Sequence, residues 1–307
     1  MRIAVIGAGA VGGYFGGCLA RTGEEVFFIA RGAHLAALRQ QGLRIDSPKG
    51  DFVVYPVQAT EDASEVGTVD AVVVGVKAWQ VSEAARAIRP LVGPETVVVP
   101  LQNGVEAPAR LTEVLGDGPA LGGTCRIISR LAAPGHIIHI GAEPYVAFGE
   151  LDNRPNEQAK RLRAVFEQAG VKAEIPADIQ VAMWKKFVFI CSISGVGAVT
   201  RVPFGILRSL PETRRMMEQA MREIEAVARA RNIRLPSNVT PETLSFIDQL
   251  PPDGTASMQR DIMAGRPSEL ETQNGAVVRL GRMADVAVPL HTFIYHSLLP
   301  QEQQARR

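Results

Sequence analysis

The first half of the chain alternates short apolar runs with amphipathic segments. Four runs rich in β-branched residues stand at positions 3–6, 26–29, 71–74 and 96–99. Continuous apolar runs of this length are typical of strands that are buried on both faces, as in a parallel sheet covered by helices. Residues 79–89 and 105–115 have the spacing of amphipathic helices. This alternation predicts a doubly wound α/β domain.

Shorter apolar runs predict additions to this domain. Residues 43–45 and 52–55 flank a turn-rich stretch between Asp46 and Gly50, so they predict an inserted hairpin. Residues 135–140 and 145–148 are expected to add antiparallel strands.

The pattern changes after Pro176. Segments with helical periodicity, separated by Pro or Gly, follow at residues 177–199, 211–231, 242–249, 257–264 and 268–285. No convincing strand pattern remains in this half. We therefore predict an α/β domain over residues 1–174 and an all-α domain over residues 175–307. The polar tail, residues 301–307, is expected to fray.

Composition narrows the class of protein. A length of 307 residues suggests roughly two domains at about 150 residues each. Hydrophobic residues make up 46% of the chain, enough to bury a sizeable core. The 33 basic and 32 acidic residues nearly cancel, which argues against a sequence-wide electrostatic grip on nucleic acid or an anionic membrane. We expect a soluble globular protein.

The cysteines and the N-terminus bear on the compartment. Cys18, Cys125 and Cys191 lie far apart and form no CxxC pair, so neither a disulfide framework nor a structural zinc site is expected. No signal-peptide pattern follows Met1. The longest apolar run, residues 187–200, is shorter than the ~20 residues that span a bilayer, and predicts a buried core helix. These features fit a reducing cytoplasm.

A glycine-rich motif follows the first predicted strand and opens a helical pattern. It comprises Gly7, Ala8, Gly9, Ala10, Val11 and Gly12, a GxGxxG spacing. In a Rossmann-type domain the first glycine allows a tight turn, the second allows close approach of a pyrophosphate, and the third allows close helix–strand packing. The helix N-terminus then offers free N–H groups to the phosphates. The motif predicts dinucleotide binding; the alternative is a plain glycine-rich turn.

Basic and amide side chains stand at the ends of three further predicted strands. Arg31 follows the second strand, where an acidic residue would favour NAD, so a 2′-phosphate and NADP are favoured. Lys77 and Asn103 follow the next two strands, at the edge where doubly wound sheets bind ligands. They could hold phosphate, ribose or a substrate carboxylate. Each could instead be an ordinary solvated or turn residue.

These motifs resemble those of one enzyme family. The matching stretches are residues 7–12, 77–80 and 101–104, Trp184-Lys185-Lys186, and the series Ser257, Met258, Asp261, Gly265, Arg266, Glu269, Leu270 and Glu271. Together they closely resemble 2-dehydropantoate 2-reductase, also called ketopantoate reductase, over nearly the whole chain. The resemblance implies NADPH-dependent reduction of a 2-keto acid, in pantothenate biosynthesis, in a cleft between the two domains.

The resemblance also implies roles for individual residues. Lys186 would be the general acid, because the family's catalytic lysine is the second position after the tryptophan. Lys77, Asn103 and the backbone of Ile128 would line the cofactor site, with Asn103 also near the substrate. Ser257 would touch the substrate, and Glu269 would hold the cofactor or the new hydroxyl. Apart from the resemblance, the two lysines would be a solvated helix face.

The sequence departs from the family where the substrate is expected to bind. The family usually has asparagines four and eight residues after the catalytic lysine and again before a later glycine; here Ile190, Ser194 and Phe204 stand there. Isoleucine and phenylalanine side chains offer no hydrogen bonds. The pocket could accept a more apolar 2-keto acid, or bind ketopantoate through other groups, including Ser194.

Other interpretations stay open. A non-catalytic NADP(H)-binding sensor would need only the first domain's site. Residues 190–199 and 289–299 could support a homodimer or form the second domain's own core. His136 and His139 are three apart on a predicted strand and would point to opposite faces, so no metal site is expected.

Overall fold

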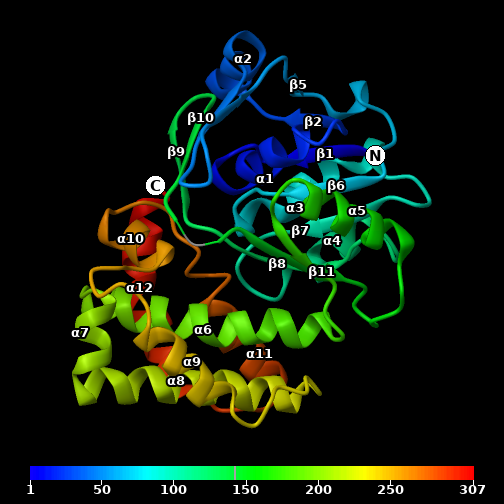
Figure 1. Ribbon diagram of the computed structural model, residues 1–307. Helices are drawn as coiled ribbons and strands as arrows, with labels where there is room; N and C mark the ends of the chain where they lie inside the picture. The colour runs from blue at the N-terminus through cyan, green and yellow to red at the C-terminus, as the bar shows by residue number, and fades with distance from the viewer. Residues whose placement is uncertain (142) are drawn as a thin grey trace. The chain divides into compact units, whose positions relative to one another are not determined.

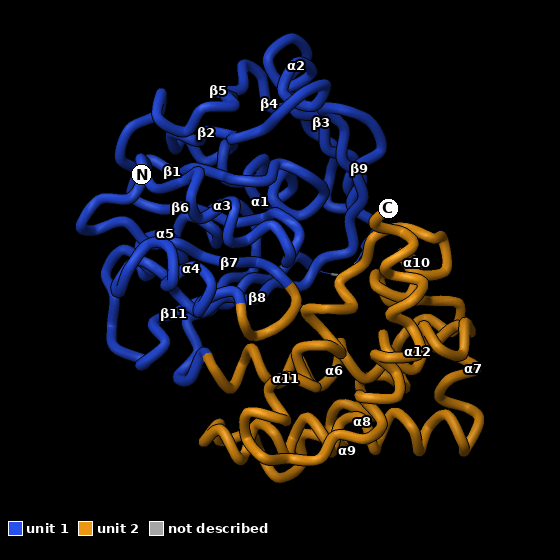
Figure 2. Tube along the Cα trace, turned by 180° about the vertical axis from the view of Figure 1, so that it is seen from behind, with its two compact units in different colours: residues 1–102, 107–179 blue, residues 103–106, 180–307 orange. Residues whose placement is uncertain are grey.

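The computed structural model describes residues 1–141 and 143–307. The chain forms two compact units, distinguished by colour in Figure 2. Unit 1 comprises Met1–Gln102 and Ala107–Ile179, and unit 2 comprises Asn103–Glu106 and Gln180–Arg307.

A parallel sheet forms the centre of unit 1. Its strands are β1 (Arg2–Ile6), β2 (Glu25–Ile29), β5 (Gln58–Thr60), β6 (Ala71–Val74) and β7 (Val97–Pro100). They lie in the order β5-β2-β1-β6-β7, and all neighbours are parallel. The four predicted strands are confirmed, and every residue of β6 and β7 is buried. The edge strand β5 was missed, because it is short and largely polar.

Helices cover both faces of this sheet (Figure 1). They are α1 (Ala10–Ala20), α2 (Gly32–Gln41), α3 (Val81–Ala87), α4 (Ala107–Leu115) and α5 (Glu157–Gln168), with short 3-10 turns at Ala63–Glu65, Ala78–Gln80 and Arg89–Leu91. Alternate residues of β1 enter different cores, as the two-residue period of a strand requires. Val5 packs in one core with residues of α1 and α5, and Ala4 packs in another with residues of α3 and α4. The doubly wound prediction is confirmed.

Two further sheets extend unit 1. One contains β3 (Leu43–Asp46), β4 (Phe52–Val54), β9 (Ser129–Ala133) and β10 (His136–His139); the other contains β8 (Gly122–Arg126), β11 (Tyr145–Gly149) and β12 (Lys172–Glu174). The predicted hairpin is confirmed as the antiparallel pair β3–β4. The strands expected at residues 135–140 and 145–148 form as β10 and β11, and each pairs antiparallel on one side and parallel on the other.

Among the residues that the structure describes, the regular secondary structure of unit 2 consists of helices alone. Its helices are α6 (Ile179–Thr200, whose first residue belongs to unit 1), α7 (Phe204–Ser209), α8 (Pro211–Ala230), α9 (Val239–Asp248), α10 (Ser257–Met263), α11 (Asn274–Met283) and α12 (Pro289–Ala305). Figure 1 shows α7 as the short helix between the ends of α6 and α8. The helix expected over residues 268–285 begins only at Asn274.

The boundary between the two units falls after Ile179, a few residues later than the boundary expected after residue 174. Ile175 packs against the core of unit 1, and the Asn153 side chain accepts a hydrogen bond from the Ile179 N–H at 3.2 Å. These contacts keep the segment before α6 with unit 1. The tetrapeptide Asn103–Glu106, between β7 and α4, belongs to unit 2.

The expectation of a frayed tail is wrong. Helix α12 continues to Ala305, and Glu302 within its last turns is only 4% exposed. The Glu302 carboxylate accepts hydrogen bonds from the backbone N–H and the hydroxyl of Ser268 and from Arg306. These hydrogen bonds offset the cost of burying the Glu302 carboxylate. The polar composition of the tail did not indicate that this side chain would be buried.

Helix α6 is the core helix of unit 2. It is long and apolar enough to span a membrane by composition alone, but 67% of its most apolar stretch is buried within the protein. Residues on α6, such as Ile193 and Val196, share one core with Ile294 and Leu298 of α12. The apolar stretches considered for association therefore contribute to the unit's own core.

Candidate functional site

The predicted cofactor residues of unit 1 gather at one edge of the parallel sheet. The glycine-rich loop follows β1, Arg31 follows β2, and Lys77 follows β6. Because these strands are parallel, their carboxyl ends lie at the same edge. β2 and β6 flank β1 on opposite sides, so the chain order reverses there. Doubly wound sheets bind ligands in the crevice at such a reversal.

Two glycines of the loop are required by the packing of the protein, independently of any ligand. Gly7 has a φ of +84°, and a side chain there would bring Cβ within 2.6 Å of the Val76 nitrogen. A Cβ at Gly12 would collide with the Gly7 carbonyl oxygen and approach Gly75 Cα at 3.2 Å. The close approach of α1 to the end of β1 and to Gly75 thus depends on both.

Gly9 differs from these two glycines. Its φ is −70°, which any residue can adopt, and a Cβ there would meet no described atom within 4 Å. Gly9 is also the N-cap of α1, whose first turn carries no acidic side chain and no side-chain cap. The first N–H groups of a helix lack partners within it and bind phosphate readily. The open space and the unopposed helix end fit a dinucleotide pyrophosphate.

Side chains from the β9 region support this loop. The Ser129 hydroxyl donates to the Ala10 carbonyl at 3.0 Å, which brings the neighbouring Ile128 beside the start of α1. The Ile128 carbonyl accepts the Ile140 N–H at 2.7 Å. Ile128 was identified only through the resemblance, and no local pattern indicated Ser129.

The two predicted basic residues are exposed. The Arg31 guanidinium lies 3.0 Å from Glu83 and 3.9 Å from Glu61, with all three side chains well exposed. Exposed ion pairs of this kind contribute little, roughly 0–1 kcal/mol, so a phosphate could replace them. The Lys77 ammonium lies over the Trp79 ring, 5.7 Å from its centroid.

Gln102 holds the ends of two strands together. Its side-chain amide donates to the Val74 and Val76 carbonyls at 2.8 and 2.9 Å. Its buried Oε1 has no hydrogen-bond partner among the described residues. Gln102 is part of the family-like stretch 101–104, but no role could be inferred for it from the sequence. The structure indicates that it positions the segment that leads to Lys77.

In unit 2, two predicted residues are in direct contact. The Asn103 side-chain amide donates to Glu269 Oε2 at 3.1 Å, and Gln273 donates to the same oxygen at 3.3 Å. Glu269 is 8% exposed. Gly104, with a φ of +106°, packs against the Thr272 carbonyl, where a Cβ would lie only 2.9 Å from the oxygen. Asn103 and Glu269 form the core of the candidate site in this unit.

Helix α6 carries three of the predicted residues. Lys186, Ile190 and Ser194 are spaced at intervals of four, so they lie along one face. Lys186 and Ile190 are half-buried, whereas Ser194 is fully buried, and its hydroxyl has no hydrogen-bond partner within the described chain. The adjacent Lys185 pairs with Glu242 of α9 at 3.6 Å.

The segment that carries Glu269 packs against α6. The Asn274 amide donates to the Cys191 carbonyl at 3.3 Å, and Gly195 lies against the same amide group. Burial, and secondarily the negative charge of Glu269, raises the pKa of the Cys191 thiol well above its usual range. Cys191 is therefore a neutral thiol next to the candidate site.

Ser257 lies toward the other end of α6. It begins α10, and Gln259 of that helix donates to the Val202 carbonyl at 2.8 Å and packs against Gly197. These contacts place α10 against the C-terminal half of α6, whereas Lys186 is in its N-terminal half. Phe204 is buried and packs beside Gly254.

The family-like motif after Ser257 forms a turn that leads to Glu269. Arg266 donates to the Asp261 carboxylate at 2.9 and 3.1 Å, and its backbone N–H donates to the Asp261 carbonyl. Gly265 between them has a φ of +65°. The spacing of Asp261, Gly265 and Arg266 thus stabilises the turn.

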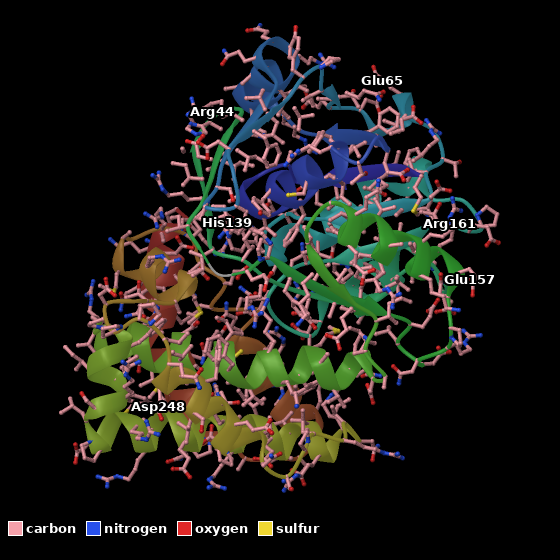
Figure 3. The ribbon with its side chains drawn as sticks, in the orientation of Figure 1. Arg44, Glu65, His139, Glu157, Arg161 and Asp248 are labelled. Atoms are coloured by element: carbon pink, nitrogen blue, oxygen red, sulfur yellow. The ribbon has the colours of Figure 1, made fainter. Side chains whose placement is uncertain are left out.

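The two histidines on β10 have protein partners. His136 Nε2 lies 2.8 Å from Asp46, and His139 Nδ1 lies 2.9 Å from the Ser47 hydroxyl. Figure 3 labels His139 and Arg44, which belong to the same sheet. Over residues 1–141 and 143–307, no group of three or more His, Cys, Asp or Glu side chains could hold a metal ion.

Comparison with known families covers most of the chain. Residues 3–153 match the family model described as "Ketopantoate reductase PanE/ApbA", and residues 178–302 match the model for the C-terminal part of the same family. The two matches correspond closely to the α/β and helical units.

Individual relatives match along all or nearly all of their length. A 2-dehydropantoate 2-reductase of Mesorhizobium japonicum is 30% identical over 94% of each chain. An uncharacterized oxidoreductase of Bacillus subtilis is 29% identical over 99% of this chain and 100% of the relative. The crystal structure of a PanE/ApbA family ketopantoate reductase from Ralstonia eutropha is similar with a TM-score of 0.90 and 32% identity, covering 100% of both chains.

Proposed function

Because the chain belongs to the ketopantoate reductase family, we propose that it reduces a 2-keto acid to a 2-hydroxy acid with NADPH. The first candidate substrate is 2-dehydropantoate, which the names of several relatives specify. The reaction consumes one proton, and Lys186 is its general acid. Family membership makes the chain an oxidoreductase; the coenzyme, the substrate and the acid are the proposal.

The loop after β1 and Arg31 bind the coenzyme. The open space at Gly9 and the N–H groups at the start of α1 accept the pyrophosphate. Arg31 pairs with the 2′-phosphate, which favours NADPH over NADH. Lys77 and the Ile128 backbone line the same site. When bound, NADPH supplies the hydride that reduces the keto carbon.

Lys186 supports the chemistry at the carbonyl oxygen. Negative charge develops on this oxygen as the carbon is reduced, and a nearby ammonium stabilises it and then donates a proton. Lys186 rather than Lys185 is assigned this role, because the family's catalytic lysine is the second residue after the tryptophan, here Trp184. The half-buried position of Lys186 on α6 supports the assignment.

The observation that most strongly supports the proposal is the hydrogen bond between Asn103 and Glu269. These residues come from two separate motifs, 166 positions apart, and meet at 3.1 Å. Glu269 lies in a segment fixed against α6, the helix of Lys186. Asn103 and Glu269 orient the coenzyme or the substrate hydroxyl.

A second candidate substrate is a more apolar 2-keto acid. Ile190 follows Lys186 by one helical turn on the same face of α6, where the family usually has an asparagine. A site that lacks the amide loses its discrimination for a substrate hydroxyl. A branched or aromatic keto acid would then compete with 2-dehydropantoate.

The test follows NADPH absorbance with purified protein, 2-dehydropantoate and a panel of apolar 2-keto acids, with NADH in parallel. We expect oxidation of NADPH with at least one keto acid. Lys186→Ala should lower kcat by at least about a hundredfold, within the range of general acid catalysis. The matched control, Lys185→Ala, should keep the activity, because its ion pair lies at the surface.

The outcomes distinguish the candidates. Turnover of 2-dehydropantoate that collapses only in Lys186→Ala supports the proposal in full. Turnover of another keto acid alone shifts the substrate and keeps the mechanism. Tight NADPH binding without turnover across the panel contradicts the reductase proposal and favours a non-catalytic sensor.

A further inference from the structure

His34 of α2 contacts the glycine-rich loop through its imidazole ring. Its Nε2 lies 2.8 Å from the carbonyl oxygen of Ala8, the residue between Gly7 and Gly9. Its Nδ1 accepts the N–H of Gly135, in the turn between β9 and β10, at 3.1 Å. The ring therefore bridges the loop and the β9–β10 turn.

The two contacts determine the protonation state of the ring. Since Nδ1 accepts a hydrogen bond from a backbone N–H, it carries no proton. The proton of the neutral ring is then on Nε2, which donates to the Ala8 carbonyl. Burial lowers the pKa of His34 below its usual value, which keeps this neutral form at neutral pH.

The contact with Ala8 fixes the direction of a neighbouring N–H group. The Ala8 carbonyl and the Gly9 N–H belong to one planar trans peptide, so they point in opposite directions. A carbonyl held toward His34 turns the Gly9 N–H away from it. Gly9 is also the loop position where a Cβ would meet no described atom within 4 Å.

A second side chain holds the same region from the β9–β10 hairpin. Ser129, at the start of β9, donates to the Ala10 carbonyl at 3.0 Å. The hairpin thus reaches the loop twice, directly through Ser129 and through His34 from its turn. Ala8 itself is buried, at 3% exposed, so its peptide has few alternative orientations.

We propose that His34 is a positioning residue for the coenzyme: it orients the Ala8–Gly9 peptide so that the Gly9 N–H can bind the pyrophosphate. This inference rests on the proposed binding of NADP(H) by the loop. The partners of His34 are the backbone of Ala8 and Gly135, and it is not assigned a contact with the keto acid or the nicotinamide. Its loss should therefore weaken coenzyme binding and leave the rate of the chemical step unchanged.

The test compares His34→Leu and His34→Gln with the wild type and with His136→Leu as a matched control. His136 directly follows Gly135 in the chain, but its own side chain pairs with Asp46. His136→Leu therefore removes a histidine side chain close to the same turn and leaves the His34 contacts with Ala8 and Gly135 in place. The affinity for NADP+ is measured by calorimetry, and kcat and the KM for NADPH are measured with the active keto acid. Hydrogen exchange of the peptide spanning residues 7–12 is followed in the coenzyme-free proteins.

We expect His34→Leu to raise the Kd for NADP+ and the KM for NADPH by about tenfold, the equivalent of about 1.4 kcal/mol, with kcat unchanged. His34→Gln, which keeps a donor for the Ala8 carbonyl, should recover part of this loss. Loop exchange should be faster in His34→Leu alone. His136→Leu should match the wild type in all three measurements.

Each other outcome overturns the proposal. An unchanged Kd and unchanged loop exchange in His34→Leu would show that His34 does not position the loop. Faster loop exchange with an unchanged Kd would show that the Gly9 peptide does not bind the coenzyme. A wild-type protein that binds no NADP+ would instead overturn the proposed function, and this inference with it.

Discussion

At the scale of single residues, Gly9 and Gly12 lack a side chain for different reasons. Gly12 faces the Gly7 carbonyl, so its substitution disturbs the packing of α1 on the sheet. Gly9 faces open space, so its substitution disturbs only what would bind there. This difference separates a folding requirement from a binding requirement within one motif.

Gly9→Ala should therefore leave the melting temperature unchanged and weaken NADP+ binding by at least about tenfold, because the methyl group occupies the space of the pyrophosphate. Gly12→Ala should destabilise the fold by about 1–3 kcal/mol, as overpacked sites do. Thermal unfolding and calorimetric titration of both variants provide the measurements. Equal NADP+ affinity in Gly9→Ala and the wild type would refute the assignment of the space at Gly9.

Candidate site residues could be predicted from the sequence where they directly follow a recognisable strand. The glycine spacing, Arg31 and Lys77 follow strand ends that the apolar runs define, and the structure puts them at one sheet edge. His34 and Gln102 could not be found in this way. Their roles depend on carbonyls and N–H groups that only the folded chain brings within reach.

At the scale of elements, the last turns of α12 support the segment that carries Glu269. Glu302 binds both the N–H and the hydroxyl of Ser268, and Arg306 donates to the Ser268 carbonyl at 2.9 Å. Ser268 directly precedes Glu269. The C-terminal helix thus fixes the start of the 268–273 segment from the far end of the sequence.

Glu302→Ala should leave the buried Ser268 N–H without its partner, at a cost of about 1–3 kcal/mol. The variant should also raise the KM for the keto acid more than it lowers kcat, because Glu269 loses its support. Gln301→Ala is the matched control, since Gln301 is exposed on the same turn. If thermal unfolding and kinetics of Glu302→Ala equal those of the control, α12 does not position this segment.

The sequence predicted elements well where burial follows a simple period. The parallel strands and the long helices α6 and α8 appeared within a few residues of their expected positions. The tail was misjudged because a polar composition does not reveal that one carboxylate finds buried partners. The apolar spacing of residues 268–285 predicts one helix, but the Ser268 hydroxyl accepts the Leu270 N–H and residues 270–273 form turns before α11.

At the scale of the whole molecule, the candidate site residues are distributed over both units. Unit 1 holds the loop and basic side chains suited to a dinucleotide, and unit 2 holds Lys186, Asn103 and Glu269. The division into an α/β and an all-α part was predictable from periodicity. The membership of Asn103–Glu106 in unit 2 was not, because it depends on contacts with the distant residues Glu269 and Thr272.

The most direct test of the central claim is to trace the hydride. The protein is incubated with NADPH carrying deuterium at both C4 positions and with the keto acid that it turns over best, starting with 2-dehydropantoate. The mass of the hydroxy acid product is then measured. We predict a product heavier by one mass unit, with the deuterium on C2. A product without deuterium, or no hydroxy acid at all while NADPH binds, would contradict the assignment of this chain as an NADPH-dependent 2-keto acid reductase.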